Sequence, residues 1–288
     1  MSRDVEIEAV LAVLKEKKGI DLTGYRRETI KKRVSERITR YHMVDPGKYL
    51  ELIQTDIHEC EALLSEILIH ASWFFRDPIV FEIIEQSLLP SIIAEKSKRP
   101  LKSREIRIWS VGCAAGEEPY STAILVHQAL ERTNMNWKTY IFATDIDPGA
   151  LERAKTGIYM RESFMSTKLG NLDRYFISKE NSSMFEVRPF IKAMVFFSLE
   201  DCTSAKIMAP AESVFGTFDM VLCRNLLIYF SRELQKKVLS KLTKTILPGG
   251  YLILGESESL IGDVESEFLT VDSRNKIFQK ILRNTTRK

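Results

Sequence analysis

Residues 106–121 read IRIWSVGCAAGEEPYS, and this stretch decides the fold class. A short apolar run with β-branched residues leads into small residues and then into a helical pattern that starts near Glu117. This order predicts a strand, a tight turn and a helix. Gly112 and Gly116 tolerate strained dihedral angles in the turn and let the backbone approach a ligand closely. The stretch therefore predicts a strand–helix unit of an α/β domain with a binding site at the turn.

A second strand further along the chain ends in carboxylates. Residues 139–147 read TYIFATDID, so Asp145 directly follows an apolar run. In doubly wound sheets, an acidic residue at the end of the second strand accepts hydrogen bonds from a ribose hydroxyl. The two segments together predict an α/β domain that binds a nucleoside.

The chemistry of the turn narrows the choice of nucleoside. A dinucleotide fingerprint would read GxGxxG and would aim the start of the helix at a pyrophosphate. Here Glu117 and Glu118 stand where the phosphate would lie, and they would repel it. S-adenosyl-L-methionine (SAM) offers a ribose, an ammonium and a sulfonium but no phosphate, so we expect SAM as the cofactor. The alternative is that the two glutamates only favour the helix dipole.

The chain divides by pattern into an all-α N-terminal domain at residues 1–70 and an α/β domain at 71–288. The second domain starts with a linker-like helical lead-in at 77–105, and its alternation of strands and helices lapses at about 158–193. A helix expected over 25–41 concentrates positive charge, which predicts an acidic partner, although a charge run is usually a solvated face. Its cations are Arg26, Arg27, Lys31, Lys32, Arg33, Arg37 and Arg40.

Composition excludes several other classes of protein. The 288 residues are 44% hydrophobic and carry a net charge of +3, as in ordinary globular chains. No apolar run approaches the length of a membrane span, and no signal peptide is recognisable. The four cysteines and four histidines show no ligand spacing. We therefore expect a monomeric, cytoplasmic protein with no metal site and no membrane insertion.

Six segments resemble motifs of the bacterial chemotaxis receptor glutamate methyltransferases, and they occur in the same order along nearly the whole chain. This resemblance implies a class I SAM-dependent methyltransferase fold: a doubly wound seven-stranded sheet with a small inserted β-subdomain, preceded by a small all-helical domain. It also implies methylation of glutamate side chains on chemoreceptors, with S-adenosyl-L-homocysteine as the second product. The segments are SWFFRD (72–77), GCAAGEEPYS (112–121), ATDID (143–147), FDMVLCRNLLIYF (218–230), LPGGYL (247–252) and GESE (255–258).

The resemblance also implies roles for individual residues. Arg76 would lie at the SAM and substrate site, and an arginine held by the adjacent Phe74 and Phe75 can bind a carboxylate bidentately. Tyr229 would lie near the transferred methyl group. The implied receptor-facing cations are Arg26, Arg33, Arg37 and Arg40. The implied cofactor residues are His70, Ser72, Arg76, Gly112, Ala114, Glu117, Asp145, Asp201, Cys202, Asn225 and Leu226.

A glutamate acceptor is already ionised at neutral pH, so methyl transfer to it needs no general base. The sequence offers no Ser-His-Asp or Cys-His constellation, which favours this reaction over hydrolysis. Two other functions stay open: a class I methyltransferase acting on another substrate such as nucleic acid, and a non-catalytic SAM-binding scaffold. Residues 178–185 (SKENSSMF) contain no glycine. We therefore expect docking through the basic helix rather than dependence on a receptor's C-terminal pentapeptide.

Overall fold

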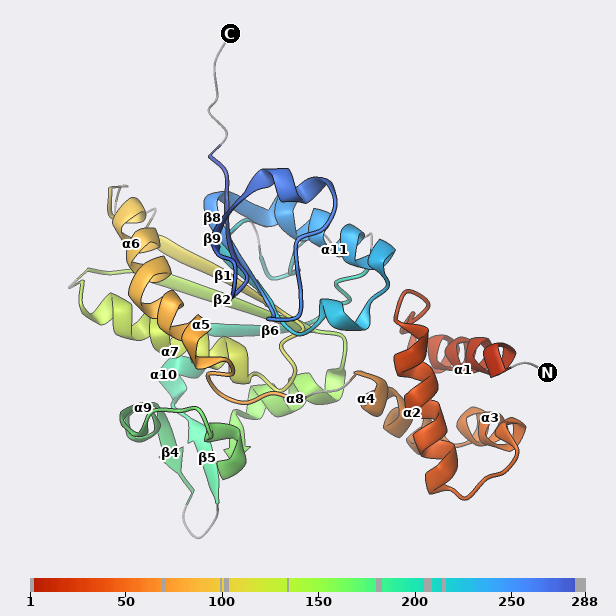
Figure 1. The fold of residues 1–288 in the computed structure, drawn as a ribbon. Coiled ribbons are helices and arrows are strands. Elements are labelled where there is room, and N and C mark those ends of the chain that lie inside the picture. Colours follow the sequence, from red (N-terminus) through yellow and green to blue (C-terminus); the bar gives the residue numbers. More distant parts are fainter. Residues whose placement is uncertain are drawn as a thin grey trace. The chain divides into compact units, whose positions relative to one another are not determined.

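The computed structural model describes residues 3–68, 71–98, 100, 104–133, 135–179, 183–204, 209–213 and 216–282 (Figure 1). The chain forms two compact units. The first comprises Met1–His70 and Tyr229–Gln235, and the second comprises Ala71–Ile228 and Lys236–Lys288. His70, an expected cofactor residue, lies outside the described residues.

The second unit is built on a seven-stranded sheet in the order β6-β2-β1-β7-β8-β10-β9. Strand β10 runs antiparallel to both of its neighbours, while β6, β2, β1, β7 and β8 run parallel. This is the predicted class I methyltransferase sheet, and the fold class is confirmed. The strands are β1 (Glu105–Val111), β2 (Lys138–Asp145), β6 (Val195–Leu199), β7 (Phe218–Cys223), β8 (Ile246–Leu254), β9 (Phe268–Asp272) and β10 (Ile277–Lys280).

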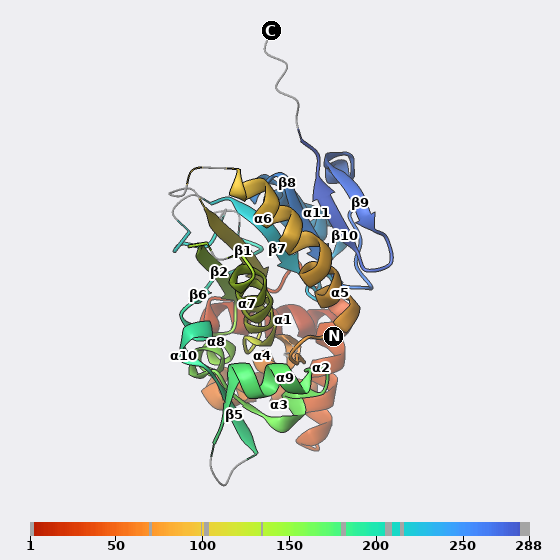
Figure 2. The same cartoon turned by 90° about the vertical axis from the view of Figure 1, so that its left-hand side faces the viewer.

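Helices cover both faces of this sheet, which is why all six residues of β7 are buried. Helices α5 to α7 lie on one face and α11 lies on the other (Figures 1 and 2). Helix α11 is shared, because its first residues belong to the first unit. The helices are α5 (Pro78–Ile83), a π-helical turn (Ile84–Leu88), α6 (Leu89–Ser97), α7 (Glu117–Glu131), α8 (Pro148–Thr156) and α11 (Arg232–Thr245).

The lead-in expected at 77–105 is not linker-like. Its helices bury Phe81, Ile84 and Leu89 in the same hydrophobic core as the strand residues Ile108 and Met220. The sequence suggested a linker because the polar residues 95–105 follow the helical part of this segment. An apolar stripe on α5 and α6 instead makes them a layer of the α/β unit.

The predicted β-subdomain is confirmed as an insertion between α8 and β6. Its three strands pair antiparallel in the order β3-β5-β4. They alternate between an outer face that includes Met160 and an inner face that includes Tyr159. The elements are β3 (Ile158–Met160), a 3-10 turn (Arg161–Phe164), α9 (Leu169–Tyr175), β4 (Phe176–Ser178), β5 (Met184–Val187) and α10 (Pro189–Lys192).

The first unit contains the predicted all-α N-terminal domain, which is confirmed. Gly19, with φ of +69°, follows the first helix, and the Asp45 carboxylate accepts a hydrogen bond from Gly47 N at 2.9 Å to cap the third. The fully buried Leu14, Ile30 and Ile53 form part of its core. The helices are α1 (Arg3–Lys18), α2 (Arg27–Arg40), α3 (Pro46–Thr55) and α4 (Ile57–Leu68).

The segment Tyr229–Gln235 packs with these helices rather than with the strands that precede it. Arg26 N donates to Tyr229 O and Ser231 N donates to Gly24 O, both at 2.8 Å. The rings of Tyr25 and Phe230 meet edge to face at 4.9 Å. The start of α2 is therefore bound to the segment that carries Tyr229.

Arg37 on α2 does not face a partner, so this expectation from the sequence is wrong. Its residue is only 7% exposed, and its guanidinium binds Glu59 through two nitrogens and Glu66 at 2.7 Å. Glu59 also accepts hydrogen bonds from the hydroxyls of Tyr41 and Tyr49, each at 2.7 Å. Arg37 therefore holds α2 to α4, and a charge run in the sequence conceals an internal ion pair.

We predict that Glu59→Gln lowers the free energy of unfolding by about 3–5 kcal/mol, because it removes one partner of a buried ion pair. Burial by itself would raise the pKa of Glu59, but hydrogen bonds from Arg37, Tyr41 and Tyr49 outweigh it and lower that pKa. The contribution of the carboxylate is therefore present above its unfolded pKa and is lost as the pH falls through the folded pKa. Urea unfolding at several pH values should show a difference from wild type that shrinks in acid.

The matched control is Arg40→Gln, since the Arg40 side chain is 59% exposed and shares Glu66 with Arg37. Exposed pairs contribute at most about 1 kcal/mol, so this variant should unfold almost as wild type does. Equal losses in the two variants would contradict an internal role for Glu59.

Candidate functional site

The loop between β1 and α7 is tied to the end of β2. Gly112 N and Cys113 N both donate to Thr144 O, at 2.8 and 3.0 Å. Gly112 has φ of +71°, and a Cβ there would lie 2.9 Å from a methyl carbon of Leu226. Glycine is therefore required at this turn, which brings two of the expected cofactor residues, Gly112 and Leu226, into contact.

Asp145 connects the ends of the first two strands. Its Oδ2 accepts a hydrogen bond from Ala114 N at 2.8 Å, and its Oδ1 accepts one from Asp147 N at 2.9 Å. The residue is 8% exposed. The structure thus brings Asp145 together with Ala114, and gives the carboxylate a role in shaping the loop that the sequence did not predict.

The two adjacent glutamates at the start of α7 have different environments. Glu118 accepts a hydrogen bond from the Ser110 hydroxyl at 2.7 Å and pairs with Arg224 at 3.1 Å, so it is an internal structural group. Glu117 is 5% exposed, lies near the Ser72 side chain, and has an Oε2 atom with no hydrogen-bond partner. Burial raises the pKa of Glu117. Of the two carboxylates expected to attract a cationic ligand, only Glu117 is left to do so.

Arg224 is the centre of a buried ion-pair network at the end of β7. Its side chain is 2% exposed and binds Asp77 at 2.7 Å and Glu118 at 3.1 Å. It also donates to Arg76 O at 3.0 Å and lies over the Phe81 ring at 5.4 Å. One guanidinium therefore joins β7, α7 and the segment that carries Arg76.

Glu258 shapes the loop after β7 in a similar way. It is 4% exposed and accepts hydrogen bonds from Gly255 N at 2.6 Å, Asn225 N at 3.1 Å and Ile228 N at 3.3 Å. Asn225 has φ of +57°, a conformation that costs a non-glycine residue energy unless its surroundings impose it. Glu258 supplies these surroundings and so fixes the backbone of Asn225, an expected cofactor residue.

The segment before α5 is held by aromatic packing. Phe74 contacts the rings of Tyr159, Phe164 and Phe176 of the inserted subdomain at 4.8, 4.9 and 5.0 Å. Phe75 N donates to the Ser121 hydroxyl at 2.9 Å. These contacts fix the backbone on both sides of Phe74.

The aromatic partner of Arg76 differs from the one expected. Its guanidinium lies over the ring of Trp73 at 4.8 Å and donates to Ala71 O at 2.8 Å. Phe74 and Phe75, the partners that the sequence suggested, are both buried in the core. Residues adjacent in sequence point in different directions here, so the nearest aromatic in sequence was not the one in contact.

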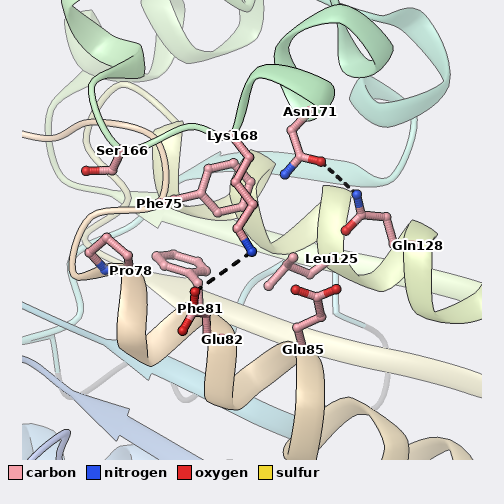
Figure 3. A pocket seen from close by; sticks show the side chains of 10 residues that line it. All are labelled: Phe75, Pro78, Phe81, Glu82, Glu85, Leu125, Gln128, Ser166, Lys168 and Asn171. Atoms are coloured by element: carbon pink, nitrogen blue, oxygen red, sulfur yellow. Dashed lines mark hydrogen bonds and ion pairs between the residues drawn. The ribbon is translucent and has the colours of Figure 1, made fainter.

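A pocket of about 130 Å³ has the Phe75 side chain as part of its wall (Figure 3). Phe75, Phe81 and Leu125 supply its apolar wall, and Glu82 and Lys168 face each other across it at 3.8 Å. None of the expected cofactor residues lines this pocket. It is therefore separate from the loop that follows β1.

Asp201 and Cys202 follow β6, whose last residue Leu199 pairs with Asp145. Asp201 accepts hydrogen bonds from the backbone and hydroxyl of Thr203, at 2.7 and 2.6 Å. Burial raises the pKa of Cys202 to about 12. Their expected contact with adenine stays a prediction. Tyr229 belongs to the first unit, and its expected place near the methyl group also stays a prediction.

Known families match both units. Residues 5–68 match the CheR methyltransferase all-alpha domain, and residues 70–277 match the CheR methyltransferase SAM-binding domain. The chain belongs to the CheR methyltransferase family. This assignment confirms the resemblance drawn from the motifs and confirms SAM as the cofactor.

Several curated proteins are similar along most of the chain. The chemotaxis protein methyltransferase of Escherichia coli K12 is 29% identical over 260 residues, which cover 89% of this chain and 85% of that protein. Chemotaxis protein methyltransferase 1 of Pseudomonas aeruginosa is 31% identical over 263 residues, which cover 89% and 91%. An uncharacterized 104.1 kDa protein of Rhodobacter capsulatus is 31% identical over 263 residues, which cover 91% of this chain but only 26% of that protein.

The residues at the loop after β1 fit SAM. A buried carboxylate oxygen without a partner is costly unless a cation or a donor reaches it, and Glu117 carries such an oxygen. SAM carries an ammonium and a sulfonium, either of which would satisfy this atom. Asp145 and Ala114 lie at the same turn, at the carboxyl ends of β1 and β2 where ligands of such sheets bind.

Arg224 and Glu258 organise the site, although the sequence did not predict this role for them. Both belong to quoted motifs: Arg224 directly follows the apolar strand β7, and Glu258 lies four residues after the end of β8. Charged residues are almost never fully buried unless they are paired. A charged residue close to the end of a buried strand could therefore have indicated a buried, paired charge. What the signal could not supply is the identity of their partners.

No helix in the part of the chain that the structure describes is long and apolar enough to span a membrane. Within the same residues, no group of three or more His, Cys, Asp and Glu side chains could hold a metal ion. The absence of a metal site stays a prediction.

We predict that Glu117→Gln weakens SAM binding and at the same time stabilises the ligand-free protein. Because burial raises the pKa of Glu117, its stabilising contribution is present below the unfolded pKa and is lost as the pH rises through the folded pKa. Without SAM, the variant should therefore melt at a higher temperature than wild type at about pH 8, and the difference in melting temperature should be smaller at about pH 5. Calorimetric titration with SAM gives the affinity.

Glu118→Gln is the matched control, because it removes a partner of Arg224 and should lower stability instead. An unchanged SAM affinity in Glu117→Gln would remove Glu117 from the cofactor site.

Proposed function

We propose that this chain transfers the methyl group of SAM to glutamate side chains on the cytoplasmic helices of chemoreceptors and forms glutamyl methyl esters. Family membership supports SAM-dependent methyl transfer in general. The choice of a carboxylate as the acceptor rests on the environment of one arginine.

Arg76 carries this proposal. Its guanidinium is oriented by Trp73 and by Ala71 O, and its own carbonyl is held by Arg224. Among the described residues, no carboxylate forms an ion pair with Arg76. A planar guanidinium that is already oriented but lacks an anion can bind a carboxylate through two parallel hydrogen bonds at little entropic cost. An incoming glutamate is such an anion.

The chain's own residues would then position the reactants and exclude water. When bound, SAM supplies a methyl carbon to which a glutamate oxygen bonds while the carbon–sulfur bond breaks and its electron pair returns to sulfur. No proton moves in this step, so positioning and desolvation are the main requirements. Burial raises the pKa values of Cys113, Cys202 and Cys223, which keeps these thiols protonated and poor as competing methyl acceptors.

Exposed cations of α2, together with Arg26, which directly precedes it, support docking of an acidic receptor helix. Arg26 and Arg40 are exposed, while Arg33 is partly buried and pairs with Glu36 at 2.8 Å. With Arg37 engaged internally, the proposed receptor-binding residues are Arg26, Arg33 and Arg40. Independence from a receptor pentapeptide and a monomeric state also stay proposals, since residues 180–182 of the expected peptide-binding stretch lie outside the described residues.

The acceptor can be identified by the stability of the product in base. We predict that tritiated SAM labels receptor-containing membranes from the source organism and that mild alkali releases the label as volatile methanol, because carboxyl esters hydrolyse there. Membranes without the enzyme serve as the control. Base-stable label on nucleic acid would favour the alternative substrate, and SAM binding without any transfer would favour a scaffold.

We predict that Arg76→Ala lowers the rate of receptor methylation much more than it lowers SAM affinity. Arg76→Lys should recover little of the rate, because a lysine cannot reproduce the planar fork of a guanidinium. The rates come from the tritium assay and the affinities from calorimetric titration with SAM. Equal losses of rate and affinity would restrict Arg76 to a cofactor-binding role.

A further inference from the structure

A further pocket of the second unit is lined by α11 and by no residue of the loop after β1. Its volume is about 510 Å³, within the range of roughly 300–1,000 Å³ that is typical of small-molecule sites. One wall is the part of α11 from Lys236 to Lys244, a second is the loop Cys202–Ser204, and a third is the segment 261–267.

Four lysines of α11 line this pocket. Lys237, Lys241 and Lys244 recur at the spacing of one helix face, and Lys236 lies beside them. Residues 236–245 read KKVLSKLTKT and contain no acidic residue. Among the described residues, none of these four lysines forms an ion pair with a carboxylate. The helix therefore concentrates positive charge along an open pocket, with Lys236, Lys237 and Lys244 exposed and Lys241 buried.

Lys241 differs from the other three lysines because it is buried. It is only 9% exposed, and its ammonium donates to the backbone carbonyls of Cys202 at 2.9 Å and Ser204 at 3.0 Å. Among the described residues, no carboxylate forms an ion pair with this ammonium, although Asp201 and Glu200 act on its charge from a longer distance. Burying a charge without a direct ion-pair partner is costly. Burial accordingly lowers the pKa of Lys241. An anion in the pocket would compensate this charge.

The wall opposite the lysines has a different character. Ile261 and the buried Val264 contribute apolar surface, and Asp263 and Glu267 contribute carboxylates. Carboxylates repel a second anionic group but accept hydrogen bonds from hydroxyls. A ligand that suits both walls has a phosphate at one end and an apolar ring with hydroxyl donors at the other.

We propose that this pocket binds a nucleoside diphosphate, with its pyrophosphate on the α11 lysines and its nucleoside against the segment 261–267. Lysine is a common ligand for phosphate, and several lysines on one face neutralise the charge of a pyrophosphate. The inference rests on the pocket alone and does not depend on which substrate the enzyme methylates.

Calorimetric titration of the full chain, both free and saturated with S-adenosylhomocysteine, tests this proposal, because Cys202 lines the pocket and is also an expected adenine contact. Binding that S-adenosylhomocysteine abolishes would assign the nucleotide to the cofactor site instead. The probes are GDP, guanosine and inorganic pyrophosphate. We predict that GDP binds, that pyrophosphate binds more weakly, and that guanosine does not bind measurably. Raised salt should weaken GDP binding, since the interaction is electrostatic at a partly exposed site.

The double variant Lys237→Glu/Lys244→Glu should bind GDP at least about tenfold more weakly, because it replaces two charged hydrogen-bond donors. Both side chains are on exposed residues, so the fold should be retained. The control Lys138→Glu/Lys155→Glu changes the net charge equally at exposed positions outside the pocket, and its affinity should stay within about twofold of wild type.

Three results would overturn the proposal. These are no GDP binding at millimolar concentration, equal weakening in the two double variants, and binding of guanosine as tight as that of GDP. Pyrophosphate binding as tight as GDP would also overturn the assignment of the nucleoside end.

Discussion

The organisation of the α/β unit depends on one buried guanidinium, that of Arg224. It lies at the end of β7 and bonds Glu118 of α7 and two adjacent groups of a second segment, the Asp77 carboxylate and the Arg76 carbonyl. A charge with 2% exposure of its side chain is tolerated only when it is paired and hydrogen-bonded, so all three contacts must form together. Arg224 thereby fixes the backbone position of Arg76, the expected substrate-binding arginine.

Buried carboxylates around this network divide into two kinds. Glu118, Asp145 and Glu258 all have protein donors: Glu118 binds the side chains of Ser110 and Arg224, whereas Asp145 and Glu258 bind backbone N–H groups of loops. Glu117 keeps an oxygen without a partner. Polar groups that are fully satisfied stabilise a structure, whereas an unsatisfied one is a cost that a ligand can remove. This contrast, rather than acidity as such, distinguishes the proposed ligand group from its neighbours.

The same reasoning applies to cations. Arg37 lies in the middle of a basic run and yet is internal, because Glu59 and Glu66 surround it. Lys241 is nearly as buried as Arg37, but none of the carboxylates that the structure describes forms an ion pair with it. Charge counted along a sequence therefore does not show which cations are available to a partner. The presence or absence of an internal counter-charge does.

The amino-acid sequence by itself determined the fold class, the cofactor and the family. These follow from local order: an apolar strand, a small-residue turn, a helix, and an acidic residue after the next strand. Such patterns depend on residues that are close in the sequence, so they can be recognised without knowledge of the tertiary contacts.

Only the tertiary structure decided which side chains of these motifs face a ligand. Glu117 and Glu118 are consecutive on a helix, so they point to different sides, and no local rule says which side is the site. Arg224 and Glu118 are separated by 106 positions, and Arg76 rests on Trp73 rather than on Phe74 or Phe75. These outcomes depend on packing between distant segments, where a buried charge takes whichever partner the fold brings to it.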